Sequence, residues 1–453
     1  MQRRPFTIAL AALPVVACST PGARDAQRVA AQADVLMQGL AARQRFQGAV
    51  VIGSSGQAQY AAGFGHADVE RRTPFTPDTP ADGASIAKTF TAALLLTLAH
   101  DGRLNLDAPV RSIVPAYPHA ATRVRHLLAH SAGLPDFDWF DARVPPGEPR
   151  TNAMHLAIVA REALPPAFAP GSAYTYDNVA YDAAAMVAER VTGRTYAQLI
   201  AQRYAQPLGM DSAFVRPARF ADWAGVRTRG YRRDAQGGLQ AHDAFDLEGF
   251  HGGSNLYLSA RDLWRWMAGY RRVVPDAAYR AAMTPAQLDD GRRTGLSGGS
   301  WFVSPDRARR YYTGHHQGFY CVGYANDGKD LAVAWVANDA PPSWLQPALT
   351  RALVAVAEGR EPERLIAPPP ADAAVDPSGR YAVPQVGDVT VRRAEPRLRV
   401  ELRSVEYQGF PVARGVHYVP GLDANLRFAA APGGATTMHW DSVYHVAPSV
   451  PRQ

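Results

Sequence analysis

The distribution of apolar residues predicts three buried helices. Ser85–Ala99 is apolar almost throughout after its first turn, Val179–Val191 forms a second apolar stretch, and Leu258–Met267 forms a third, with Ser259 as its predicted N-cap. Each stretch is too short to cross a bilayer, so we expect each to pack inside a folded domain.

Short β-branched and apolar runs predict an antiparallel sheet around these helices. Gly48–Ile52 and Ala58–Ala61 flank a Ser-Ser-Gly turn and indicate a hairpin; further strands are expected up to His315, over Phe319–Tyr324 and over Leu331–Val336. Amphipathic helices are expected over Asp25–Leu40 and Pro347–Val356. Helices and an antiparallel sheet together indicate an α+β fold.

The character of the chain changes near its end. Residues 359–375 include Pro368-Pro369-Pro370 and few large apolar residues, which is typical of a linker. Residues 376–453 alternate with period two between Gly, Pro and Asp turns, which predicts a small all-β, barrel-like module. The division predicted is therefore a main domain over 26–358, a linker over 359–375 and a module over 376–453.

The N-terminus resembles an export signal. Arg3 and Arg4 precede an apolar stretch that ends at Ala17, so residues 1–17 are predicted to be a signal peptide. Val15-Val16-Ala17-Cys18 resembles a bacterial lipobox, which predicts a lipid on Cys18, a tether over 18–25 and a periplasm-facing membrane lipoprotein. The alternative is a plain secretory signal with an incidental cysteine.

The amino-acid composition limits the partners and metal sites that this protein can have. Hydrophobic residues make up 47% and charged residues 20%, as in a folded protein. The formal net charge is +7, and the sequence contains no basic stripe, so no nucleic-acid partner is expected. With two cysteines, a thiolate zinc cluster is excluded. Among 48 Lys plus Arg residues, Lys88 and Lys329 are the only lysines. Arginine takes the other cationic positions, so a retained lysine suggests an amine that must lose its proton, which a guanidinium cannot do. Lys329 lies in a predicted turn, so Lys88 is the candidate for this role.

Ser85 and Lys88 are the candidate reactive pair. Three residues is close to one helical turn, so both side chains share a face at the start of a helix. A serine hydroxyl needs a nearby base, and a buried amine can supply one. Alone, the spacing also fits an N-capping serine with a solvated lysine.

Downstream residues favour the catalytic interpretation. Tyr176-Asp177-Asn178 stands before the second apolar helix, and Gly314-His315-His316-Gln317-Gly318 lies on a predicted strand. With Ser-x-x-Lys, these elements resemble those of serine β-lactamases and penicillin-binding proteins. His126-Leu127-Leu128-Ala129-His130-Ser131-Ala132-Gly133-Leu134-Pro135 and Pro207-Leu208-Gly209-Met210 strengthen the resemblance to the group of class C β-lactamases, D-alanyl-D-alanine carboxypeptidases, D-aminopeptidases and related esterases.

The resemblance implies roles for individual residues. Ser85 would form the acyl-enzyme and its N–H would be one oxyanion donor. Lys88 would take the serine proton or hold the network, Tyr176 would relay protons to the leaving group, and Asn178 would bond Lys88 or the substrate amide. His316 would stand where other relatives carry a lysine; His315 is the alternative, one residue out of register and therefore on the other face of the strand.

The residues disfavour two rival sites. His126 and His130 have i, i+4 spacing, but Leu127 stands where a zinc protease carries glutamate, so the pair is interpreted as structural. Gly83–Ala87 half-matches a nucleophile elbow, but the polar, proline-containing segment before it does not suit the strand that an α/β-hydrolase requires.

The expected protein is a β-lactamase/transpeptidase-like enzyme: an antiparallel sheet flanked by helices, an all-α lobe and a C-terminal barrel. We expect an exported serine hydrolase that cleaves peptide or D-amino-acid amides without metal or organic cofactor. The alternatives are an esterase, a class C-like β-lactamase, or a non-catalytic penicillin-binding sensor. The module would shape the cleft or serve as a cell-envelope docking domain.

Overall fold

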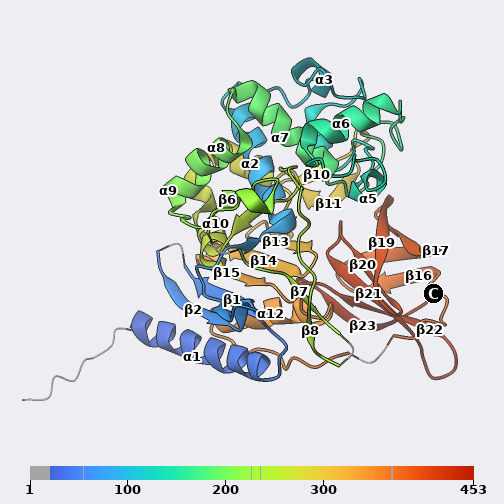
Figure 1. The fold of residues 1–453 in the computed structure, drawn as a ribbon. Helices are drawn as coiled ribbons and strands as arrows, with labels where there is room; N and C mark the ends of the chain where they lie inside the picture. Colours follow the sequence, from blue (N-terminus) through green and yellow to red (C-terminus); the bar gives the residue numbers. More distant parts are fainter. Residues whose placement is uncertain (1–20, 55, 226, 235, 369–370) are drawn as a thin grey trace, which may run out of the picture.

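The computed structural model describes residues 21–54, 56–225, 227–234, 236–368 and 371–453 (Figure 1). The predicted signal peptide and Cys18 lie outside these residues. Helix α1 spans Pro21–Ala42, so it begins earlier than expected and includes the end of the predicted tether. In the described part of the chain, no helix combines the length and apolar character that a bilayer span requires.

A six-stranded antiparallel sheet forms the centre of the main domain. Its order is β12 (Phe302–Val303), β13 (Arg309–His316), β14 (Phe319–Asn326), β15 (Leu331–Ala337), β1 (Gly48–Gly53) and β2 (Ala58–Phe64). The predicted hairpin of β1 and β2 is confirmed, with Ala49 opposite Gly63. β1 also pairs with β15, which brings the two ends of the main domain together.

Helices cover both faces of this sheet, which explains why β1, β14 and β15 are buried almost throughout rather than alternating. On one face, Trp335 of β15 donates its indole N–H to Thr350 of α12 (Leu345–Ala357), 3.1 Å away. On the other face, Gly323 of β14 packs against Met267 of α10 (Ala260–Val273). The Ser259 hydroxyl caps α10, as predicted, although Leu258 belongs to a strand.

A helical lobe lies beside the sheet around the buried helix α2 (Ala87–His100) (Figure 1). Its other helices are α3 (Val110–Ile113), α4 (Val124–Leu128), α5 (Phe137–Phe140), α6 (Asn152–Arg161), α7 (Val179–Thr192), α8 (Tyr196–Ile200) and α9 (Gln206–Leu208). A later helix, α11 (Asp276–Ala282), packs against α2. The short strands are β3 (His66–Asp68), β4 (Thr73–Pro74), β5 (Ala81–Asp82), β6 (Phe214–Val215), β7 (Tyr231–Arg233), β8 (Leu239–Ala241), β9 (Leu256–Leu258), β10 (Pro285–Gln287) and β11 (Arg293–Ser297).

The C-terminal module is an eight-stranded antiparallel meander in which each strand pairs with its neighbours in sequence. The strands are β16 (Gly379–Val383), β17 (Gly387–Ala394), β18 (Arg397–Leu402), β19 (Val405–Ala413), β20 (Val416–Val419), β21 (Ala424–Ala430), β22 (Thr436–Asp441) and β23 (Val446–Pro451). A bridge between Tyr381 and Arg452 nearly closes the sheet into a barrel around its own apolar core. The predicted α+β domain followed by an all-β barrel-like module is confirmed.

Candidate active site

Ser85 lies at the point where a short 3-10 turn, Ala84–Ile86, runs into α2. Ala84 just before it has φ +44°, a left-handed conformation that costs a residue with a side chain about 1–3 kcal/mol. The Ala84 N–H donates to Asp82 Oδ1 at 2.8 Å, which helps to hold this conformation. Ser85 makes no capping bond to the helix and is half-buried, so its hydroxyl remains available for chemistry.

Lys88 is fully buried one turn later, which contradicts the alternative of a solvated lysine. Its Nζ lies 3.2 Å from Ser85 Oγ, 2.6 Å from Asn178 Oδ1 and 2.8 Å from the carbonyl oxygen of Gly253. The last two atoms can only accept hydrogen bonds. As an ammonium, Lys88 donates to all three oxygens; as a neutral amine, its two N–H groups can donate to Asn178 and Gly253, which leaves the lone pair for the Ser85 hydroxyl proton.

Burial shifts the protonation equilibrium of Lys88 toward the neutral amine. Burial lowers the pKa of Lys88 from 10.5 to about 8, against the opposing effect of the carboxylates of Asp136, Asp182 and Asp177. At pH 7 roughly one lysine in ten is then deprotonated, compared with roughly one in 3,000 for an unperturbed side chain. The environment thus increases the population of the base about 300-fold.

Tyr176 is the second partner of Ser85. Its hydroxyl donates to Ser85 Oγ at 2.9 Å, and burial raises its pKa above the usual value, so it remains a neutral phenol. The ring of His130 stacks on Tyr176 with centroids 4.6 Å apart. Burial lowers the pKa of His130 to about 3, and its Nδ1 accepts the Asp177 N–H at 3.1 Å. His130 is thus a neutral support for the tyrosine, which agrees with its structural interpretation.

Asn178 is oriented by a residue that the sequence did not single out. The Asn178 amide nitrogen donates to Asp136 at 2.9 and 3.2 Å, which turns its oxygen toward Lys88. Asp136 directly follows the Gly133-Leu134-Pro135 segment, but its spacing from Asn178 gives no signal because the two meet only in the folded chain.

Strand β13 presents a different side chain to Tyr176 from the one predicted. The hydroxyl of Tyr312 lies 3.3 Å from that of Tyr176. His316 instead directs Nδ1 to Asp82 Oδ2 at 2.8 Å, with Nε2 3.7 Å from Glu248. The expected His316-Gln317-Gly318 element is where β13 ends and turns, with Gln317 at φ +52°. Tyr312-Thr313-Gly314 lies beside the nucleophile, since Gly314 packs closely against the backbone of Gly83.

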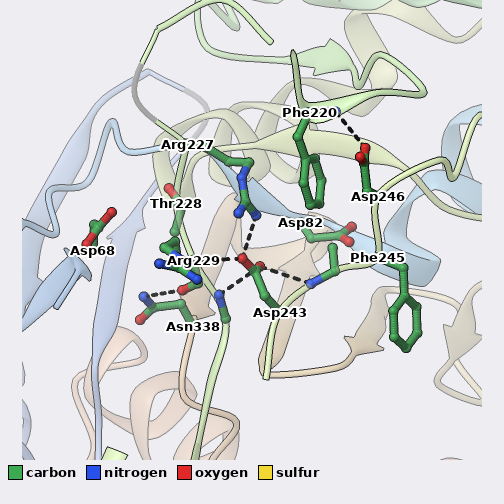
Figure 2. A network of polar contacts seen from close by, with 12 residues as sticks. Asp68, Asp82, Phe220, Arg227, Thr228, Arg229, Asp243, Phe245, Asp246 and Asn338 are labelled. Carbon is green, nitrogen blue, oxygen red and sulfur yellow. Dashed lines mark hydrogen bonds and ion pairs between the residues drawn. The ribbon is translucent and has the colours of Figure 1, made fainter. Parts of the chain in front are cut away.

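The carboxylates around His316 are fixed by neighbouring structure. The Asp82 and Glu248 carboxylates raise the pKa of His316 to about 9 despite its burial. The segment before Glu248 is anchored by Asp243, whose Oδ2 lies 2.6 Å from Arg227 Nη1 and whose Oδ1 accepts the Gly230 N–H at 3.0 Å (Figure 2). His316 is therefore a cation with both nitrogens facing carboxylates.

A cavity of about 570 Å³ opens at Ser85, within the usual size range of small-molecule sites. Ser85, Tyr176, Asn178, His315 and His316 all line it. The C-terminal module contributes another part of the wall: Phe410, Val412, Tyr418, Pro420 and Asn425. The module thus borders the reaction site.

Comparison with known proteins identifies the family. The beta-lactamase family model matches residues 33–358, which is most of the chain and includes every residue of the Ser85 cluster. The protein belongs to the beta-lactamase family.

Individual relatives agree with this family assignment. Penicillin-binding protein 4* of Bacillus subtilis is 26% identical over 292 residues, covering 60% of this chain and 64% of that protein. The D-aminopeptidase of Gluconobacter oxydans is 30% identical over 249 residues, covering 54% and 46%. The matches thus span less than two thirds of these curated relatives. The octameric penicillin-binding protein homologue of Pyrococcus abyssi shares the fold over 93% of this chain and 99% of its own, with TM-score 0.61 and 21% identity.

Within this beta-lactamase-family fold, the structure brings together Ser85 and Lys88, as their spacing predicted, with Tyr176 and Asn178, as the family resemblance implied. It adds Asp136 and Tyr312, and it places His316 in a separate ion-paired cluster. His315 lies beside it and is exposed to solvent. The signal that could have located Tyr312 is its Thr313-Gly314 continuation, which matches the end of the Lys-Thr-Gly strand element.

Proposed function

We propose that this member of the beta-lactamase family is an exported hydrolase that cleaves amide bonds of peptides or D-amino-acid derivatives through an acyl-enzyme on Ser85. The observation that carries the proposal is the geometry of Lys88: a buried amine with two acceptors already satisfied and Ser85 Oγ as its third partner. The name of the relative at 30% identity, a D-aminopeptidase, supports the substrate class.

Each atom has a defined part in the proposed reaction. Lys88 Nζ takes the hydroxyl proton as Ser85 Oγ attacks the substrate carbonyl carbon, and the Ser85 N–H would stabilise the resulting oxyanion. Collapse of the tetrahedral intermediate breaks the C–N bond, and the leaving nitrogen takes a proton delivered by Tyr176, which is reprotonated from Lys88. Water then attacks the acyl ester with the same groups acting as base and acid, releasing the carboxylic acid and free Ser85.

The charge of the cavity favours neutral or amine-bearing substrates over anionic ones. Among the described residues, no arginine or lysine lines the Ser85 cavity. Its cation, His316, already faces Asp82 and Glu248. Penicillins and C-terminal D-alanyl peptides carry a carboxylate that would find no free cation there, so a D-amino-acid amide suits the site better than a β-lactam.

An acyl ester is the second candidate substrate, because the cavity wall is rich in aromatic side chains that suit an apolar acyl or alcohol group. Steady-state kinetics with D-phenylalanine p-nitroanilide, its L enantiomer, a chromogenic cephalosporin and p-nitrophenyl acetate separate the reactions. We expect the highest kcat/KM for the D-anilide and no turnover of any substrate by Ser85→Ala. Turnover of the ester alone would refute the amidase proposal and support an esterase.

The sensor alternative has a distinct signature. Intact-mass analysis after a pulse of the D-anilide or of penicillin is expected to show free protein, since water regenerates Ser85. A permanent adduct with no steady-state turnover would instead support a penicillin-binding sensor.

The export part of the proposal rests on the lipobox-like sequence at Cys18. In a bacterial host, the full-length chain is expected in the membrane fraction and Cys18→Ser in the soluble periplasmic fraction. Equal release of both proteins would support a plain secretory signal.

A further inference from the structure

A second cavity lies at one end of the C-terminal barrel. The β16–β17, β18–β19, β20–β21 and β22–β23 turns all meet at that end, because every second connection of a meander returns to the same side. These turns and the main-domain segment 283–311 enclose about 420 Å³, a volume suited to a small organic molecule. Phe302 lines both this cavity and the one at Ser85, so the two cavities are neighbours.

The charges on this cavity are all of one sign. Arg293, Arg307 and Arg403 line it, and no aspartate or glutamate of the described residues does.

None of the three lining arginines has an acidic partner. Across the parts of the chain that the structure covers, Arg293, Arg307 and Arg403 form no ion pair, and Arg403 donates to the carbonyl oxygen of Val386 at 3.3 Å. Burial and the positive charges of Arg309 and Arg403 lower the pKa of His445, as expected where cations are not neutralised. Such a surface attracts anions.

The floor of the cavity is the core of the barrel. Leu402, Tyr407 and Trp440 belong to that core, Leu422 packs against it, and all four line the cavity. Trp440 is 3% exposed, and its indole Nε1 is buried without an acceptor in the described structure. The cavity therefore combines an aromatic floor, a donor without a partner and a cationic rim.

We propose that this barrel-end cavity binds a small organic anion that has an apolar, ring-containing body and one carboxylate, sulfate or phosphate group. The body packs on Tyr407 and Trp440, and the anionic group lies among Arg293, Arg307 and Arg403. This is a binding site separate from the reaction at Ser85.

Two fluorescent probes of similar shape test the proposal with the full chain: 1-anilinonaphthalene-8-sulfonate, which is anionic, and N-phenyl-1-naphthylamine, which is neutral. The test variant is Arg293→Gln/Arg403→Gln. The matched control is Arg392→Gln/Arg399→Gln, which removes the same charge from exposed positions of β17 and β18 that pair with Glu401 and Glu406.

We expect the unmodified protein to bind one equivalent of the sulfonate, with an affinity that falls as salt increases. The test variant is expected to bind the sulfonate about tenfold more weakly while its affinity for the neutral probe stays within about twofold. The control variant is expected to bind both probes normally. Equal sulfonate affinity in the test and unmodified proteins, or equal weakening in the control, would overturn the proposal.

Discussion

The protonation state of Lys88 makes the proposed mechanism testable by pH alone. Burial lowers its folded-state pKa to about 8, so the competent neutral form gains population as pH rises toward and past that value. The neutral fraction is roughly 1% at pH 6, 9% at pH 7, 50% at pH 8 and 91% at pH 9. The value of kcat/KM should therefore rise about tenfold per pH unit below pH 7 and level off above pH 9.

The assay is kcat/KM between pH 5.5 and 10.5 with an uncharged substrate such as p-nitrophenyl acetate, corrected for spontaneous hydrolysis. Because kcat/KM reports the free enzyme, an inflection near pH 8 would belong to the unliganded site. Asp136→Asn supplies a second readout: the Asp136 carboxylate raises the Lys88 pKa, so its removal should move the inflection to lower pH.

Two results would refute this reasoning. A profile that is flat from pH 6 to 9 would mean that no group with a pKa near 8 controls acylation. An inflection well above pH 10 would instead assign the base to Tyr176, whose pKa burial raises.

Three side-chain changes test the remaining assignments. Tyr176→Phe should lower kcat for the anilide by about 10²–10⁴ with little change in KM, because the proton relay is lost while the cavity keeps its shape. Tyr312→Phe should lower kcat about tenfold through loss of its hydrogen bond to Tyr176, whereas His316→Gln should leave the pH inflection in place. An unchanged kcat in Tyr312→Phe together with a shifted inflection in His316→Gln would restore the predicted role of His316. Phe410→Ala should raise KM about tenfold for D-phenylalanine p-nitroanilide and leave p-nitrophenyl acetate unaffected, and equal effects on both substrates would argue against module residues as part of the substrate pocket.

The main elements and the reactive pair could be predicted because their signals are local. Ser85 and Lys88 are one helical turn apart, so helix geometry alone places them side by side. The apolar runs of β1, β14 and β15 and the period-two pattern after residue 376 identify strands for the same reason. The retention of lysine at position 88 in an arginine-rich chain pointed to an amine that titrates.

The folded chain decided the third element of the site, for which Thr313-Gly314 is a local signal in the sequence. Strand β13 carries both Tyr312 and His316, and both face the same side, so alternation does not choose between them. The choice depends on where β13 ends and on the carboxylates of Asp82 and Glu248, which come from distant segments and hold His316 away from Tyr176.

The sequence by itself determined that a hydroxyl and an amine share a helix face, within an α+β domain that precedes a β-rich module. The tertiary structure decided that the amine is buried, that Asp136 orients Asn178, that Tyr312 is the side chain beside Tyr176, and that the module borders the catalytic cavity. The physical reason is that periodicity fixes neighbours within an element, while desolvation and ion pairing depend on residues that only folding brings together.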